Sequence, residues 1–139
     1  MNKLLSILFI LVSVGGMFYF SSQTAIVSSI QSQFFIDVIY NTTGIIINSF
    51  IIRKLAHLFM FMMISISISL FIYIICGKLF ISTSFSFVLS SIYAIFDEYR
   101  QTFVIGRSGN INDVIIDITG VIIGIIIIGG IIWIIRKKK

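Results

Sequence analysis

The sequence is poor in charged residues. Only 11% of its 139 residues are Asp, Glu, Lys or Arg, and 58% are hydrophobic, whereas soluble domains contain about 25% charged residues. A soluble fold of this length would have too few polar side chains to cover its surface. Intrinsic disorder is excluded as well, because disordered chains are poor in apolar residues. The shortage of charge therefore indicates an integral membrane protein.

Cysteine and acidic residues are also scarce. Cys76 is the single cysteine, so the chain forms no intramolecular disulfide and no cysteine-based metal site. We expect an inert buried thiol, with lipidation as the alternative. The net charge is +5, but four of the cations form the run 136–139 directly after an apolar stretch. Such a cluster is typical of a cytoplasmic membrane anchor, so we expect no nucleic-acid partner.

The sequence is rich in long apolar runs. Crossing the hydrocarbon core of a bilayer takes about 20 residues, and the four candidate runs cover about residues 4–20, 55–76, 79–96 and 114–135. Lipid offers no partners for backbone polar groups, so the runs are predicted to be helices. A β-barrel would show alternating segments instead. We predict an all-α integral membrane protein with one domain, residues 1–139.

The first apolar run has a second interpretation. Lys3, an apolar core and the small polar segment 21–25 together resemble a signal peptide. The apolar stretch is somewhat longer than the corresponding part of a signal peptide. We therefore prefer an uncleaved membrane span.

The distribution of charge predicts an orientation. Lys3, Lys78 and the run 136–139 fall on one side of the predicted bundle, without any acidic residue. The positive-inside rule makes this side cytoplasmic and places both termini there. The remaining charged residues fall at or near the outer side: Asp37, Arg53, Lys54, Asp97, Glu98, Arg100, Arg107, Asp113 and Asp117.

The connection between the first two spans is long and patterned. Ile26, Ile30, Phe34 and Val38 recur every four residues within it. This spacing predicts an amphipathic helix lying in the outer membrane interface. A loop packed over the bundle fits the sequence equally well.

Polar residues with helical spacing cluster at the outer boundary. Arg53 and His57 share a helix face because they are four residues apart. Asp97, Arg100 and Gln101 share a face at the end of the third span, whereas Glu98 is expected to point elsewhere. The candidate site residues are Arg53, His57, Asp97, Glu98, Arg100, Gln101, Arg107, Asp113 and Asp117.

The fourth span combines acidic residues with small ones. Asp113 and Asp117 are followed on the same face by Gly120 and Gly124, a small-x-x-x-small pattern that allows another helix to approach closely. Asp117 lies about one turn inside the span, where an ionisable group costs about 2.5–3.5 kcal/mol. It should face the bundle interior with a partner. The candidates for that partner are Arg53, His57, Arg100 and Arg107.

Two explanations account for these charges. They could simply pair with one another and hold the helices together. We favour a functional polar pocket, because pairing alone could be replaced by apolar packing. The arginines with His57 could hold a phosphate or pyrophosphate. The carboxylates with His57 could bind a hard divalent cation, or perform acid–base chemistry. No specific catalytic or metal motif is present, and we expect no cofactor.

Four blocks, in order along nearly the whole chain, resemble the VanZ-like family of small bacterial membrane proteins. They are Phe20–Gln23, Arg53–His57, Asp97–Phe103 with Gly106 and Arg107, and Asp113–Asp117 with Gly120 and Gly124. Their combination is specific, although each block alone is weak. Arg100 stands where many members have His, which argues against acid–base chemistry at that position. Ile105 stands where many have Pro, which only loosens the loop.

The resemblance implies a multi-pass protein of the bacterial cytoplasmic membrane, and some relatives are linked to teicoplanin resistance. We expect a non-enzymatic role at the outer leaflet: binding or shielding an envelope lipid or a lipid-linked wall precursor, or altering the access of a glycopeptide. In this hypothesis His57 bridges two helices. Arg53, Arg100 and Arg107 contact a phosphate headgroup, and Asp97, Asp113 and Asp117 orient them.

Two other functions fit the sequence. One is a membrane enzyme acting on a lipid phosphate or cell-wall intermediate, with His57 and Asp97 as acid and base. The other is an accessory subunit of another membrane protein.

Overall fold

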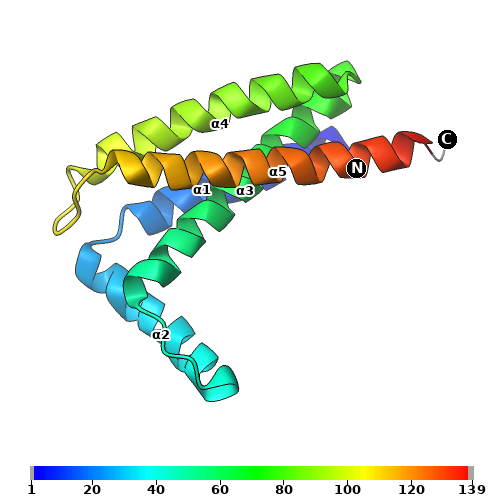
Figure 1. The fold of residues 1–139 in the computed structure, drawn as a ribbon. Coiled ribbons are helices and arrows are strands. Elements are labelled where there is room, and N and C mark those ends of the chain that lie inside the picture. The colour runs from blue at the N-terminus through cyan, green and yellow to red at the C-terminus, as the bar shows by residue number, and fades with distance from the viewer. Residues whose placement is uncertain (1, 138–139) are drawn as a thin grey trace.

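A computed structural model describes residues 2–137, so Lys138 and Lys139 of the predicted basic anchor lie outside the described residues. This part of the chain forms helices and connecting turns (Figure 1). The helices are α1 (Lys3–Ser21), α2 (Ala25–Thr43), α3 (Ser49–Cys76), α4 (Leu79–Gln101) and α5 (Ile111–Lys137). The predicted all-α fold is confirmed.

Four of these helices, α1, α3, α4 and α5, are long and apolar enough to cross a membrane. Two of them extend beyond the predicted spans. α3 begins at Ser49, where the Asn48 side chain accepts a hydrogen bond from the Phe50 amide, and α4 continues to Gln101. The predicted spans end at the first charged residues, whereas the helices continue through these residues. The polar candidate residues therefore lie on rigid helical ends.

The chain reverses so that the ends of α1 and α5 nearest the termini lie at the same end of the bundle (Figure 1). The turn after Cys76 uses Gly77 with a left-handed φ of 66°. The opposite end of the bundle carries the turn at residues 22–24, the start of α3 and the loop 102–110. We call it the site end.

α2 is a helix, as the four-residue spacing predicts, and it projects away from the bundle at the site end (Figure 1). Its apolar side chains face outward: Ile26, Ile30 and Phe34 are 73%, 67% and 67% exposed. Its buried residues are Ser28 and Ser32. The helix is thus confirmed over the loop alternative, and its outward apolar surface is suited to a membrane interface.

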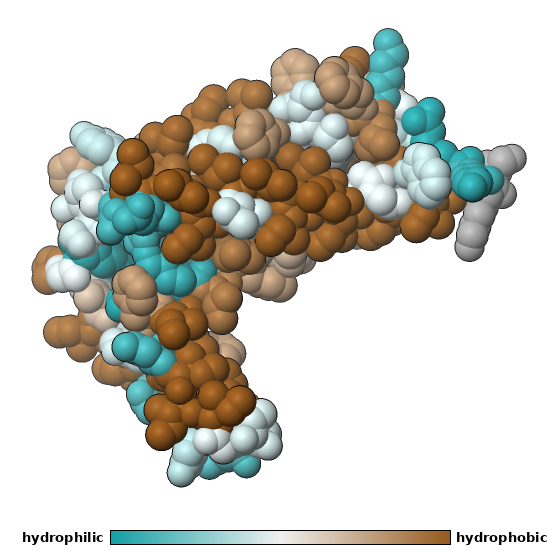
Figure 2. Space-filling model, in the orientation of Figure 1, coloured by the Kyte–Doolittle hydropathy of each residue, from teal (hydrophilic) through white to brown (hydrophobic). Residues whose placement is uncertain are grey.

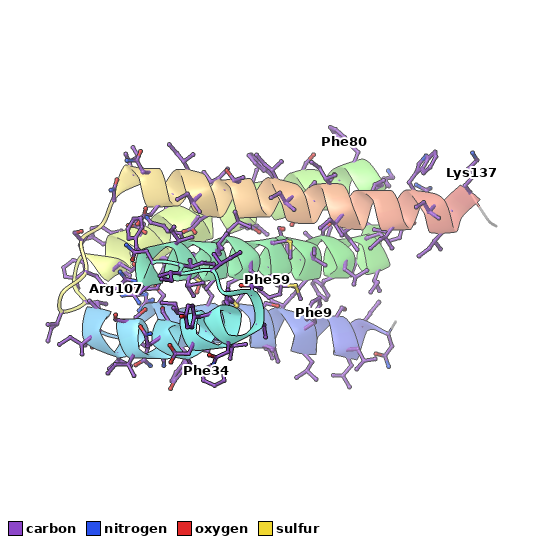
Figure 3. The ribbon with its side chains drawn as sticks, turned by 60° about the horizontal axis from the view of Figure 1, so that its bottom comes forward. Phe9, Phe34, Phe59, Phe80, Arg107 and Lys137 are labelled. Atoms are coloured by element: carbon purple, nitrogen blue, oxygen red, sulfur yellow. The ribbon has the colours of Figure 1, made fainter. Side chains whose placement is uncertain are left out.

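α3 occupies the middle of the bundle, between α1 and α5 (Figure 3). The core contains Met17, Phe61, Ile64, Ala94 and Val121. Small residues set the helix contacts around this core. The buried serines of α4 face α3 at four-residue spacing, and Ser86 Oγ donates to the Ser65 carbonyl at 2.7 Å. Such serines are packing residues, as membrane helix interfaces commonly show.

The closest helix pair is α3 with α5, which run parallel from the site end. Gly120 and Gly124 lie directly against the α3 backbone. A Cβ at Gly120 would overlap the Leu58 carbonyl, and one at Gly124 would overlap the Met62 carbonyl. This approach fixes the relative register of the two helices. The register determines which polar residues meet at the site end.

Candidate functional site

The α3–α5 register brings two pairs of charged residues together. Lys54 Nζ forms an ion pair with Asp113, and one turn deeper His57 Nδ1 lies 3.7 Å from Asp117 Oδ1. Asp117 is 1% exposed. Of its four candidate partners, the structure selects His57. His57 therefore bridges α3 and α5 through a buried carboxylate.

Asp97 lies at a separate junction, between α1 and α4. Its Oδ2 accepts hydrogen bonds from Ser21 Oγ at 2.7 Å and from Gln101 Nε2 at 2.8 Å. Its Oδ1 accepts from Arg100 Nη2 at 2.9 Å. Asp97 is completely buried. A buried carboxylate with three donors, two of them uncharged, is a fully satisfied structural group.

Arg100 is fixed on the α1 side of this junction. Besides Asp97, its guanidinium donates to Ser22 Oγ at 2.7 Å and lies over the Phe18 ring at 4.4 Å. It does not line the cavity described below. These contacts hold Arg100 at the junction of α1 and α4, away from the cavity. Spacing along α4 could not reveal this, because the competing partners come from α1.

Glu98 was expected to point away from the face shared by Asp97, Arg100 and Gln101, but it accepts from the same Gln101 amide as Asp97. Glu98 is 5% exposed. It accepts from Gln101 Nε2 at 3.4 Å and from the Asn110 backbone amide at 2.6 Å. Residue spacing along α4 does not predict the burial of Glu98, because its donor Asn110 lies in the loop that folds back over α4. Glu98 thereby holds the loop 102–110 against the site end.

That loop places Arg107 beside the site. Arg107 Nη1 donates to Gln101 Oε1 at 3.0 Å, and Nη2 donates to the Phe20 carbonyl at 3.4 Å. Burial lowers the pKa of Arg107 from its ordinary value, and the positive charge of Arg53 lowers it further, while Asp97 and Glu98 act in the opposite direction. The guanidinium remains protonated. Its positive charge is thus incompletely compensated.

A cavity of about 150 Å³ lies between α3, α5 and the loop. We call it the polar cavity. Its ionisable lining residues are Arg53, Lys54, His57, Arg107, Asp113 and Asp117. Figure 2 shows hydrophilic side chains gathered at the site end, next to the apolar sides of the bundle. Gln101 of α4 also lines the cavity, so all three predicted helical faces and the loop contribute to it.

Several polar atoms at this cavity have no protein partner. Both carboxylate oxygens of Asp117, Arg53 Nε and Arg107 Nε are buried without a hydrogen bond. Arg53 makes no hydrogen bond or ion pair with any residue from 2 to 137. Proteins rarely leave buried polar atoms unpaired. The cavity therefore has unused donors and acceptors.

Metal binding at this site depends on which ligand side chains lie together. Within the described residues, no three His, Cys, Asp or Glu side chains are grouped so that they could hold a metal ion.

Ser21 and the Phe20 carbonyl, which donate or accept hydrogen bonds at this site, were not among the predicted site residues. Both belong to the block Phe20–Gln23, whose resemblance to a family block was the available signal.

The family described as VanZ/LLP1 matches residues 6–135, a range that includes every residue of the site. Neither a curated protein nor a solved structure matches the chain.

Proposed function

We propose that this multi-pass membrane protein, which belongs to the VanZ/LLP1 family, binds the phosphate of an anionic headgroup in its polar cavity. The ligand is an envelope lipid or a lipid-linked wall precursor. The binding role is non-enzymatic.

One observation carries the proposal: two guanidinium groups at the cavity lack a carboxylate partner. Lys54 is paired with Asp113, and Asp117 lies against His57. Arg53 and Arg107 remain without an ion pair among the described residues. Guanidinium groups bind phosphate oxygens through two parallel hydrogen bonds. An anion between them would restore the charge balance.

The size of the cavity agrees with a headgroup. A buried water molecule needs about 10–15 Å³ of such space, and the cavity offers about 150 Å³. A phosphate group fits, together with a few water molecules. The carboxylates do not prevent binding, because Asp113 offsets Lys54 and Asp117 lies next to the imidazole of His57.

The lipids retained by the purified protein test this proposal. We expect wild type to retain an anionic phospholipid or lipid phosphate, detected by mass spectrometry. Arg53→Ala should lose it, because the side chain contributes a free guanidinium. Arg136→Ala is the control, since it removes one exposed cation from the opposite end. Equal lipid content in all three proteins would refute headgroup binding at this cavity.

The positive-inside rule supports an outer-leaflet position for the cavity, because Lys3, Lys78 and Arg136 lie at the other end. Lipophilic glycopeptides and wall precursors meet at that surface. We therefore extend the proposal to glycopeptide resistance. Expression in a sensitive Gram-positive host should protect selectively against teicoplanin, compared with vancomycin, and Arg53→Ala should abolish the protection at equal membrane levels. Growth inhibition identical to that of the empty host would separate this chain from resistance.

An enzymatic function is the second candidate. The pair His57 and Asp117 favours it, because an imidazole beside a buried carboxylate is an arrangement used for acid–base chemistry. Asp97 no longer qualifies as the base, since both of its oxygens accept hydrogen bonds. This candidate requires phosphate release from a lipid phosphate that His57→Ala abolishes. Turnover that persists in that variant, or is absent from wild type, would eliminate it.

A further inference from the structure

A second cavity, of about 210 Å³, lies between α1, α2 and α3. We call it the apolar cleft. In contrast to the polar cavity, its lining includes six large apolar side chains: Met17, Phe20, Phe35, Ile52, Phe59 and Met60. Neither the lipid-binding proposal nor the family match assigns a role to it.

The two cavities share two residues. Arg53 and His57 line both of them. They stand one helical turn apart on α3. The polar cavity lies on the α5 side of this pair, and the apolar cleft lies on the α1–α2 side. A molecule that contacts the unpaired Arg53 guanidinium therefore has a polar compartment on one side and an apolar one on the other.

α2 forms one wall of the cleft, and few of its side chains are buried. The lining residues that α2 contributes are Ser28, Gln31, Ser32 and Phe35. Ser28 and Ser32 are the buried residues of this helix, whereas Phe35 is 57% exposed. Because Phe35 both lines the cleft and is exposed, the cleft reaches the surface of the molecule.

We infer that the apolar cleft holds a hydrocarbon chain of the same lipid whose phosphate occupies the polar cavity. The ligand class is thus a lipid phosphate with one chain inside the protein. An apolar cavity of about 150 Å³ can hold benzene, so about 210 Å³ accommodates a segment of one chain. This inference rests on the proposed function and adds the position of the chain.

Affinity alone is a poor test of the cleft. Lipid tails are as apolar as leucine, so a chain gains little by leaving the bilayer for the cleft. The phosphate supplies the binding energy, and the cleft determines where the chain lies. The experiment must therefore locate the chain.

Photo-cross-linking of the full-length protein in phosphatidylcholine nanodiscs provides that location. The probes are phosphatidic acid and farnesyl phosphate, each with a diazirine on a hydrocarbon chain. We expect adducts in the peptides around Met17 and Met60. The same diazirine chain on phosphatidylcholine should label only exposed surfaces, such as those around Phe87 and Ile126. Labelling of the cleft by only one of the two phosphate probes supports the inference and identifies the lipid source.

Two substitutions fill the cleft from opposite walls. Ala56→Phe adds a ring from α3, and Gln31→Phe adds one from α2. Both should lose the cleft adducts while still retaining the phosphate lipid during purification. Leu55→Phe is the matched control, because the neighbouring Leu55 is 54% exposed and lies outside the cleft. It should be labelled like wild type. Since the α2 variant changes a loosely packed helix, it provides the test if Ala56→Phe fails to fold.

The outcomes separate the two proposals. If both phosphate probes label the same surfaces as phosphatidylcholine while the purified protein still retains lipid dependent on Arg53, the cleft inference is overturned and headgroup binding stands. If lipid retention also fails to depend on Arg53, both are overturned. Cleft labelling that survives both Ala56→Phe and Gln31→Phe would also contradict the inference.

Discussion

Two buried aspartates of this protein have opposite surroundings. Asp97 accepts hydrogen bonds from Ser21, Arg100 and Gln101. Asp117 accepts none, although His57 lies nearby. A buried carboxylate that binds three donors stabilises the fold. A buried carboxylate without hydrogen bonds can still accept them from a ligand or from water.

Replacing each carboxylate by its isosteric amide distinguishes these roles. Asp97→Asn should destabilise the protein by about 1–3 kcal/mol, because the new amide group cannot accept all three hydrogen bonds. Asp117→Asn should cost less, since no hydrogen bond is broken. The thermal unfolding temperature of the detergent-solubilised variants measures both effects. Equal losses would show that Asp117, too, is a structural residue.

Residue spacing predicted part of this site and missed another part. Arg53 with His57, and Asp113 with Asp117, follow from four-residue spacing on single helices. The roles of Arg100 and Glu98 did not follow. Arg100 is held by Ser22 and Phe18 of another segment, and Glu98 by the Asn110 amide of a loop. Contacts between segments depend on tertiary structure, which helical periodicity does not contain.

At the scale of the elements, the α3–α5 contact determines the site. Gly120 and Gly124 let the helices touch, and this contact aligns Lys54 with Asp113 and His57 with Asp117. The sequence predicted four spans from hydropathy and a close approach from the glycine spacing. The helix α3 begins before the predicted span, because Arg53 and Lys54 interrupt the apolar run although α3 includes them.

A methyl group in this contact should disturb the site from a distance. Gly120→Ala should destabilise the protein by about 1–3 kcal/mol, because its Cβ overlaps the Leu58 carbonyl and overpacking has costs of this size. Gly129→Ala is the control, since a Cβ there has no neighbour within 4 Å. The alanine should be neutral or slightly stabilising in that helix. Unfolding temperatures that fall equally in both variants would contradict a specific helix contact.

At the scale of the whole molecule, the account requires a defined orientation. The ends of α1 and α5 nearest the termini lie at one end of the bundle (Figure 1). The residues that line the polar cavity belong to the other end. The charge distribution predicts that the first end is cytoplasmic. The lipid and glycopeptide proposals both depend on an outward-facing cavity. Orientation is therefore a property of the whole chain with direct functional consequences.

Single cysteines report this orientation in intact cells. Cys76 is the only native thiol and lies next to the turn at Gly77. It is partly exposed, so the expectation of a buried thiol is wrong. A membrane-impermeant maleimide should label Cys76 only after the membrane is opened. It should label Ser108→Cys in a Cys76→Ser background without opening. The reverse pattern would place the polar cavity at the inner leaflet.

The most direct test of headgroup binding is a lipid titration of the purified protein. A ligand that binds only the folded state raises the unfolding temperature in proportion to its occupancy. We predict that phosphatidic acid raises the unfolding temperature of wild type and of Arg136→Ala, whereas phosphatidylcholine does not, and that Arg53→Ala loses the response. An equal response to both lipids, or an unchanged response in Arg53→Ala, would contradict binding of an anionic phosphate headgroup in the polar cavity.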